Sequence, residues 1–383
     1  MTERLDQLVM SRRVLVAVGA GGVGKTTTAA ALGLAAASRG RRVLCLTVDP
    51  ARRLAEALGL ERMSSQEQQL DPARCRSAGI AMTGSLTAMM LDTKRTFDEV
   101  ILRYASSPEH ARRLLSNKLY QYVSASLAGT QEYMAMEKLV SVQRDARFDL
   151  IVLDTPPTTN ALDFLDAPHR LVEALDSPTM RWIVQAFQST GRVSFNLLAR
   201  SAGAVLRGIA RITGAGFLES LSEFLSELND LFGGFKERAR EVESSLRSPD
   251  VAFILVSGTG PTSIQEVLFF EDRLAQSSMA RGAFVVNRFH RQPPSANRSP
   301  SESDVASEIS GKHLSLDAGA ASRVIRAYAD STKLAALDAL HVEALRRHLA
   351  DEVPIVRIPE LTTDVHDLGG LNAVADLLMT GGI

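Results

Sequence analysis

The sequence has few of the residues that mark disulfide-stabilised or membrane-spanning proteins. Its 383 residues include two cysteines, Cys45 and Cys75, which form neither a disulfide framework nor a C-x-x-C metal or redox pair. No run of about 18 uncharged apolar residues offers a membrane helix, and the first residues lack the apolar centre of a secretion signal. We therefore expect a cytoplasmic protein in a reducing compartment.

The sequence also has no excess of charge of either sign. Its formal net charge is −1 and its pI is about 6.7, so composition does not indicate nucleic-acid binding. Hydrophobic residues make up 45% of the chain, which is enough to bury a large core. The length suggests two or three domain-sized units, and it fits equally well one α/β domain with an insertion.

A glycine-rich segment, Gly19-Ala20-Gly21-Gly22-Val23-Gly24-Lys25-Thr26-Thr27, follows the apolar run Val14–Val18. It matches the Walker A pattern G-x-x-x-x-G-K-[ST], in which backbone N–H groups surround the phosphates of a nucleoside triphosphate. In this pattern Lys25 neutralises the β and γ oxygens, and Thr26 binds Mg²⁺. The helical pattern of Thr27–Ser38 would add the positive end of its dipole. We predict that the nucleotide contacts Gly21, Gly22, Val23, Gly24, Lys25, Thr26 and Thr27.

Short β-branched runs alternate with long helical patterns along the chain, which predicts an α/β fold: a P-loop NTPase with a mostly parallel, doubly wound sheet and helices on both faces. The expected strands are Val14–Val18, Val43–Val48, Gly79–Thr83, Leu150–Leu153, Val251–Val256, Ala283–Val286 and Ile355–Ile358. The expected helices include Leu86–Tyr104, Gln131–Gln143, Thr262–Ala275 and Ala320–Leu349.

Two stretches interrupt this alternation. Residues 162–247 contain no convincing strand and predict an inserted helical subdomain, which would divide the ATPase core into residues 1–161 and 248–383. Residues 290–316 are rich in Ser, Pro and polar residues, a composition that favours a mobile loop.

An acidic residue follows each of two expected strands, where the ligands of such sheets bind. Asp49 follows Val43–Val48 and is placed to orient an attacking water, or else to cap the helix that begins at Pro50; both roles could coexist. Asp154 follows Leu150–Leu153 and is a candidate Mg²⁺-side partner of the phosphate loop, or else a capping residue in a proline turn.

These segments carry a family resemblance. The chain resembles the ArsA-type ATPases, the group holding the arsenite-pump ATPase and the eukaryotic ATPase that targets tail-anchored membrane proteins. That family is marked by G-K-G-G-V-G-K-T-T, T-D-P-A-H and D-T-A-P-T-G-H-T-L-R-F-L. The matching segments here are Gly19–Thr27, Thr47–Arg52 and Asp154–Leu165, with weaker likeness at Gly129–Glu132, Val285–Arg288 and Pro354–Leu361.

The resemblance implies a Mg²⁺-ATP-driven dimer in which Asp49 positions the hydrolytic water and Asp154 senses the γ-phosphate. It also implies that Asn287 reads the adenine edge, beside Arg288, and that the loop after Pro359 closes over the base. An ordinary strand-end turn is the alternative for Asn287.

The chain departs from the family at Ala20, where the family has a lysine that reaches across the dimer to the partner's phosphates. Arg52 or Arg53 could substitute, the working dimer could pair this chain with a paralogue that keeps the lysine, or the chain could be a slow switch. The third motif also differs, with Thr159-Asn160 in place of Gly-His. Two distant cysteines disfavour arsenite transport and a zinc site between subunits.

The expected insertion contains two amphipathic segments, Leu197–Ile212 with a basic stripe and Phe217–Phe232 with an acidic side. Their apolar faces could pack into the core, form a groove for an apolar partner helix, or lie on anionic lipid, which leaves peripheral membrane contact open.

The leading hypothesis is an ATPase that binds and hydrolyses MgATP and couples nucleotide-driven dimer closure to a partner protein, including a hydrophobic or membrane-protein client. The alternative is a nucleotide-binding regulatory or scaffold subunit that depends on a lysine-bearing paralogue. A membrane-positioning ATPase is a third reading, which the absence of Lys and Arg from Leu371–Ile383 disfavours.

Overall fold

The structure, a computed structural model, describes most of the chain. The described residues are 4–48, 53–118, 120–121, 124, 130–155, 161–178, 224, 231, 234–293, 300–311, 319–349 and 353–382.

The described strands and helices alternate along the chain as an α/β fold requires. The strands are β1 Val14–Val18, β2 Arg42–Thr47, β3 Gln68–Gln69, β4 Ser85–Met90, β5 Leu150–Asp154, β6 Val251–Ser257, β7 Arg281–Phe289 and β8 Ile355–Pro359. The helices are α1 Leu5–Ser11, α2 Lys25–Ser38, α3 Arg53–Ala57, α4 Pro72–Ser77, α5 Thr93–Tyr104, α6 Pro108–Ser116, α8 Thr130–Gln143, α9 Ala161–Asp176, α14 Pro261–Gln276, α15 Glu302–Gly311, α16 Ala320–Leu349 and α17 Leu368–Thr380.

In the described part of the chain these strands form one eight-stranded sheet in the order β3-β4-β2-β5-β1-β6-β7-β8. The pairs from β2 through β5, β1, β6 and β7 to β8 are parallel, and the short β3 runs antiparallel to β4. Strand β1 lies in the middle, with β5 and β6 as its neighbours. The predicted mostly parallel, doubly wound sheet is confirmed.

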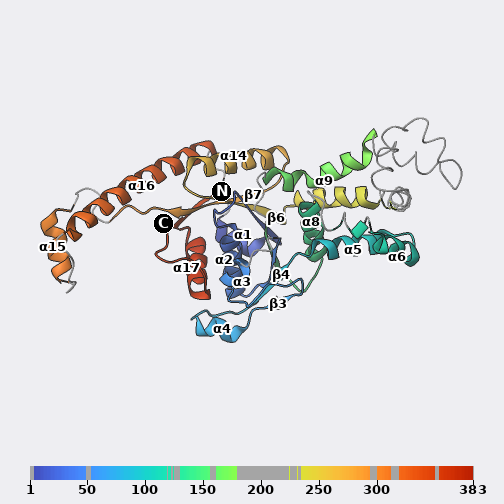
Figure 1. Ribbon diagram of the computed structural model, residues 1–383, viewed down its shortest axis with the longest axis horizontal. Helices are drawn as coiled ribbons and strands as arrows, with labels where there is room; N and C mark the ends of the chain where they lie inside the picture. The colour runs from blue at the N-terminus through green and yellow to red at the C-terminus, as the bar shows by residue number, and fades with distance from the viewer. Residues whose placement is uncertain are drawn as a thin grey trace, which may run out of the picture. The chain divides into compact units, whose positions relative to one another are not determined.

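Helices cover both faces of this sheet (Figure 1). On one face α1, α2 and α17 pack together, and alternate strand residues such as Leu15 and Val152 join their core. On the other face α14 and α16 contact β7, and Phe253 of β6 packs against Phe270 of α14 with ring centroids 6.5 Å apart. The central strands are therefore apolar throughout, as expected for strands buried on both sides.

Six of the seven strands predicted from the sequence are confirmed, and the segment from Gly79 to Tyr104 contains two errors. Gly79–Thr83 is not a strand: Gly79 has a left-handed φ of +74° and belongs to the turn that closes α4. Leu86–Tyr104 is not one helix, because its first residues belong to β4, which pairs near the edge of the sheet. The helix α5 begins after Asp92, whose side chain caps it by accepting a hydrogen bond of 2.9 Å from the Arg95 N–H.

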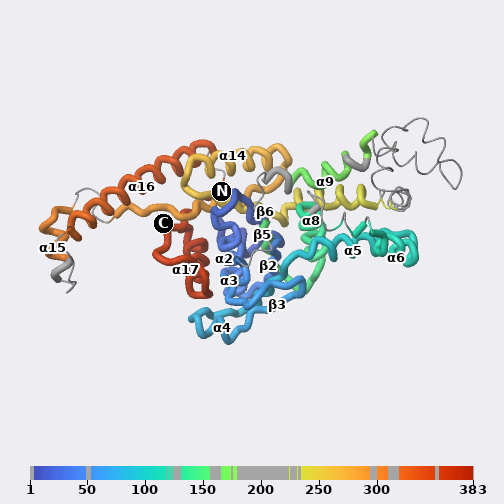
Figure 2. Tube along the Cα trace, viewed as in Figure 1, coloured from blue at the N-terminus to red at the C-terminus, as the bar shows by residue number. Residues whose placement is uncertain are grey.

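Part of the predicted loop at residues 290–316 is also helical. Ser301 and Asp304 cap each other, since the Asp304 N–H donates to Ser301 Oγ at 3.2 Å and the Ser301 N–H to Asp304 Oδ2 at 2.9 Å. This arrangement begins α15, which packs on the N-terminal part of α16 (Figure 2). The loop prediction is therefore wrong for Glu302–Gly311, while residues 294–299 and 312–318 lie outside the described residues.

The chain divides into two compact units. The first contains Met1–Met89, Arg147–Thr159 and Pro249–Ile383, and the second contains Met90–Ala146 and Asn160–Ser248. Residues 90–146, which the sequence-based boundaries place in the ATPase core, thus belong to the helical unit. The amphipathic segments Leu197–Ile212 and Phe217–Phe232 lie almost entirely outside the described residues, which include only Phe224 and Leu231 of them.

The second unit holds an ion-pair network that is buried between its helices. Arg238 is 1% exposed, and its Nε lies 2.8 and 2.7 Å from the two carboxylate oxygens of Glu137 on α8, which is also buried. Arg238 also binds Glu241, which in turn pairs with Arg144. Such a pair is costly to disrupt, because removing one partner leaves an uncompensated charge in the interior.

None of the helices in the described part of the chain combines the length and the apolar character that crossing a bilayer requires.

We expect Arg238→Ala to lower the free energy of unfolding of the helical unit by about 3 kcal/mol, because Glu137 would remain buried with only Arg103, 3.9 Å from its carboxylate, to balance its charge. Arg247→Ala is the matched control, since Arg247 forms an exposed i,i+4 pair with Glu243 whose loss costs at most about 1 kcal/mol. Urea unfolding followed by far-UV circular dichroism measures both, and equal midpoints for the two variants would contradict the prediction.

Asp149 makes a pH-dependent contribution to the folding stability of the first unit. A hydrogen bond from the Arg42 side chain lowers the pKa of Asp149 from 3.8 to about 2. Because this pKa is depressed on folding, the contribution is present above pH 4 and is lost as the pH falls from about 4 to about 2. Asp149→Asn should lower the thermal midpoint at pH 7 and lower it less at pH 3. A difference that stays constant between the two pH values would show that the ion pair contributes nothing.

Candidate functional site

The phosphate loop connects the end of β1 to the start of α2 at the centre of the sheet. Gly24 is the residue before α2 and has a left-handed φ of +96°. A Cβ at this position would stand 2.2 Å from Nδ2 of Asn287, on β7. Glycine is required here for two independent reasons, the backbone conformation and the close approach of a side chain.

The other end of the loop is equally confined. A Cβ on Gly19 would stand 2.0 Å from the carbonyl oxygen of Val256, near the end of β6. Between these two ends, Val23 is 8% exposed and belongs to the core that α2 shares with the sheet. The loop is thus held at both ends and anchored by one apolar side chain.

Lys25 is the first residue of α2 and is 6% exposed. Its ammonium group donates a hydrogen bond of 2.7 Å to the carbonyl oxygen of Ala20. The lysine therefore lies along the inside of the loop, where the Walker A pattern places it.

Asn287 ties the end of β7 to the phosphate loop. Its Nδ2 donates to the carbonyl oxygen of Val23 at 2.9 Å, and its Oδ1 accepts from the Arg288 N–H at 3.0 Å. Arg288 itself has a positive φ of 58°. The Asn287 amide thus contacts the phosphate loop on one side and the end of β7 on the other. The contact between Asn287 and adenine stays a prediction.

Asp154 ends β5, the strand beside β1, and is 1% exposed. Its Oδ2 accepts a hydrogen bond of 2.9 Å from Thr47 Oγ1 at the end of β2. The next residue, Thr155, donates from its hydroxyl to the carbonyl oxygen of Ala17 at 2.8 Å. These bonds hold the acidic strand end beside the start of the phosphate loop.

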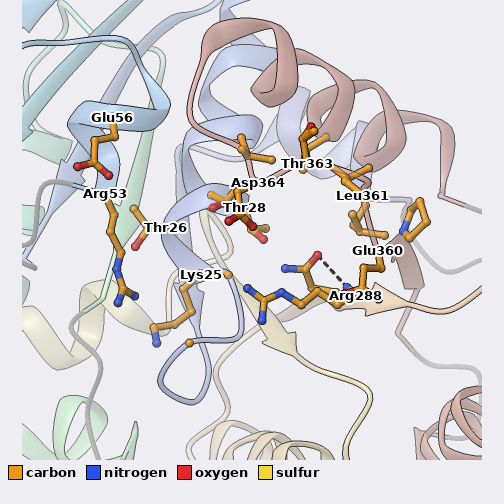
Figure 3. Close-up of a pocket in the computed structure, with 18 of the residues that line it drawn as sticks. Lys25, Thr26, Thr28, Arg53, Glu56, Arg288, Glu360, Leu361, Thr363 and Asp364 are labelled. Carbon is orange, nitrogen blue, oxygen red and sulfur yellow. Dashed lines mark hydrogen bonds between the residues drawn. The ribbon is translucent and has the colours of Figure 1, made fainter. Parts of the chain in front are cut away.

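These elements surround a cavity of about 770 Å³ (Figure 3). This volume falls within the range of small-molecule and cofactor sites, roughly 300–1,000 Å³. The lining residues are Gly22, Gly24, Lys25, Thr26, Thr27, Thr28, Arg53, Glu56, Thr155, Asn287, Arg288, Ile358, Pro359, Glu360, Leu361, Thr363, Asp364, Val365 and Val374.

Most of the residues predicted to bind the nucleotide therefore lie around one cavity. The exceptions are Gly21, Val23 and Asp154, which adjoin lining residues without being among them. Asp49 and Arg52 lie outside the described residues.

Three basic side chains lie at the phosphate end of the cavity. Figure 3 shows Arg53 and Arg288 pointing toward the phosphate loop from either side, with Lys25 between them. Arg53, from α3, is one of the two arginines that sequence reasoning named as substitutes for the missing lysine.

The opposite wall is formed by residues 360–365, the loop after Pro359 that the family resemblance implicates, together with Val374 of α17. The loop lies where ligands of parallel sheets bind, because β8 ends at Pro359. Sequence reasoning missed Val374, whose approach to the cavity depends on how α17 packs.

The site fits a magnesium nucleotide. Gly21 and Gly22 are exposed, and no atom lies within 4 Å of where a Cβ on either residue would stand, so open space adjoins the loop backbone. The start of α2 adds backbone N–H groups and the positive end of a helix dipole. The Thr26 hydroxyl and the Asp154 carboxylate are oxygen donors of the kind that Mg²⁺ prefers.

Comparisons with known proteins agree with this geometry. The family model described as the anion-transporting ATPase matches residues 12–303, which is most of the chain. The chain is similar to the ATPase get3 of Aspergillus terreus, with 26% identity over 272 residues that cover 70% of this chain and 71% of the relative.

Two other relatives show similar identity over shorter stretches. The ATPase GET3 of Mycosarcoma maydis is 27% identical over 237 residues, 60% of this chain and 61% of the relative. The ATPase ASNA1 homolog 1 of Paramecium tetraurelia is 29% identical over 158 residues, 41% of this chain and 44% of the relative. The chain is therefore an ATPase that belongs to the anion-transporting ATPase family.

Proposed function

We propose that this ATPase hydrolyses MgATP in the cavity at the carboxyl ends of β1, β7 and β8, and that nucleotide-driven closure of a dimer acts on a partner protein. The observation that supports it best is the convergence of the phosphate loop, Arg53 and Arg288 on one cavity. Positive charge at the place where a triphosphate develops negative charge is the main requirement of phosphoryl-transfer catalysis.

The phosphate end is assigned to four residues. Lys25 binds the β- and γ-phosphates, and Thr26 holds Mg²⁺ together with Asp154, directly or through a water molecule. When bound, the metal neutralises charge that develops on the phosphate oxygens. Asp49, which follows β2 by two residues in the sequence, is assigned to orient the water that attacks the γ-phosphate.

The base end is assigned to the second wall of the cavity. Ile358, Pro359, Leu361 and Val365 offer an apolar surface for a purine, and Asn287 contributes its amide group at the edge of that surface. In this proposal Asn287 exchanges a contact with the loop for one with the adenine.

We also propose that Arg53 supplies the charge that Ala20 cannot. Arg53 lines the cavity of its own chain, so it would stabilise the transition state without a lysine from a partner subunit. A guanidinium that reaches the γ-phosphate does the same in other P-loop enzymes.

The partner assignment rests on the family membership and on the inserted helical unit. The proposed partner is a hydrophobic or membrane-protein client that binds the amphipathic segments within residues 197–232. In this proposal the nucleotide state controls whether the client can reach these segments.

A regulatory subunit is the competing function, and Ala20 is the observation that favours it. In that case the chain binds ATP to hold an interface and a paralogue supplies the missing lysine. Turnover by the purified chain alone separates the two functions.

We expect the purified chain to hydrolyse MgATP at a rate per molecule that rises with its own concentration, because closure requires two copies. Lys25→Ala should lower the rate by about 100-fold or more, since the phosphates would lose their main cation. Phosphate release across a wide range of protein concentration tests this. A wild-type rate no higher than that of Lys25→Ala at every concentration would sink the proposal and favour the regulatory subunit.

Arg53→Ala should reduce kcat at least about tenfold, because the transition state would lose the positive charge of the guanidinium. The free energy of unfolding should not change, because the Arg53 side chain is exposed at the cavity. Arg76→Ala, an exposed arginine on α4 that does not line the cavity, is the matched control and should retain the wild-type rate. If both variants turn over like the wild type, Arg53 does not replace the missing lysine.

A further inference from the structure

Three side chains from separate elements contact one another in a row that ends at the wall of the cavity. They are Asp338 on α16, His290 immediately after β7, and Glu360 immediately after β8. We propose that His290 is a positioning residue for ATP, and that through it Asp338 controls nucleotide affinity although Asp338 does not line the cavity. The proposal rests on the nucleotide site proposed above.

The first link joins His290 to α16. Asp338 Oδ2 lies 2.8 Å from His290 Nδ1, and the same oxygen accepts the His290 backbone N–H at 2.8 Å. The Asp338 side chain is 7% exposed and shares the buried face of α16 with Ala335, Val342 and Leu345. A buried carboxylate requires such donors, so this contact fixes both the backbone and the ring of His290.

The second link joins His290 to the wall of the cavity. His290 Nε2 lies 2.9 Å from Glu360 Oε2, and the Glu360 backbone N–H donates to the carbonyl oxygen of Phe289 at 3.0 Å. Glu360 is 54% exposed and lines the cavity. Each ring nitrogen of His290 thus lies within hydrogen-bond distance of a carboxylate oxygen, one from α16 and one from the wall of the cavity.

The row connects the two segments that form the base side of the cavity. Asn287 and Arg288 stand three and two residues before His290, while Leu361 and Asp364 follow Glu360. His290 therefore sets the separation between the end of β7 and residues 360–365. The binding energy of a purine depends on this separation, because an apolar wall contributes only when it is in contact.

Helix α16 is held to the same edge of the sheet by a second contact. His341 Nδ1 lies 2.9 Å from the carbonyl oxygen of Thr259, in the loop between β6 and α14. Residues 338 and 341 are three positions apart and lie on one side of the helix. With both contacts in place, α16 is a rigid support for His290.

This arrangement predicts a specific kinetic pattern. The row touches the base side of the cavity, whereas Lys25, Thr26 and Arg53 lie at the phosphate end. Loosening the base side should weaken ATP binding and leave the chemical step unchanged. Replacement of His290 or Asp338 should therefore raise KM and Kd with little change in kcat.

The experiment is a double-mutant cycle on ATP affinity in the full chain. Binding of a fluorescent ATP analogue and steady-state hydrolysis are measured for His290→Ala, for the isosteric Asp338→Asn and for the double variant. We expect each single variant to raise Kd about tenfold, which corresponds to the loss of one hydrogen bond to a carboxylate, with kcat within about twofold of wild type. Asp338→Asn should have no further effect in the His290→Ala background.

Two further variants keep the outcome independent of folding defects. Glu360→Gln alters an exposed side chain and should raise Kd like His290→Ala, with faster amide hydrogen exchange at residues 360–365. His348→Ala is the matched control, because it removes a histidine of α16 that faces Glu271 and Asp272, away from the row. It should bind the analogue like the wild type.

The proposal is overturned if Asp338→Asn lowers stability but leaves Kd within twofold of wild type, or if the two single effects add in the double variant. Failure of the nucleotide site itself is recognised separately. In that case the wild type and Lys25→Ala would bind the analogue equally weakly, and the role of His290 would fall with the site.

Discussion

The site depends on the close approach of the phosphate loop to β6, which pairs with β1, and to β7, which pairs with β6. A Cβ at Gly19 would overlap the Val256 carbonyl oxygen of β6, and a Cβ at Gly24 would overlap the Asn287 amide of β7. The loop backbone consequently occupies space that any side chain would fill. Its N–H groups remain at the carboxyl edge of the sheet, beside the start of α2, because both ends of the loop are confined.

The parallel sheet brings the remaining groups to the same edge. Since β5 and β6 flank β1, and β7 and β8 follow β6, the carboxyl ends of five strands meet around the loop. Asp154 arrives from β5, Asn287 from β7 and Glu360 from β8, although 206 residues separate the first of these from the last. The groups proposed to bind the phosphates and the base thus belong to opposite walls of one cavity. For this reason we expect the row through His290 to affect nucleotide affinity and to leave the chemical step unchanged.

The second unit is built by a different kind of interaction. Its described helices bury a charged pair, Arg238 with Glu137, in addition to an apolar cluster that includes Phe235 and Tyr120. Buried ion pairs of this kind tolerate little rearrangement, because each charge depends on its partner.

Local patterns in the sequence were sufficient for the Walker A loop, the six central strands and α16, since each carries its signal within a few residues. The amphipathic pattern of Leu86–Tyr104 misled the prediction, because pairing at the sheet edge overrode the helical propensity of the first residues. The Walker A pattern named Lys25 and Thr26, and the family resemblance named Asn287; all three line the cavity. Only the tertiary structure decided that Arg53 lines the cavity and that Asp338, His290 and Glu360 form a row. Those relations join residues far apart in the chain, and contacts at such separation depend on how strands and helices pack, for which no local pattern exists.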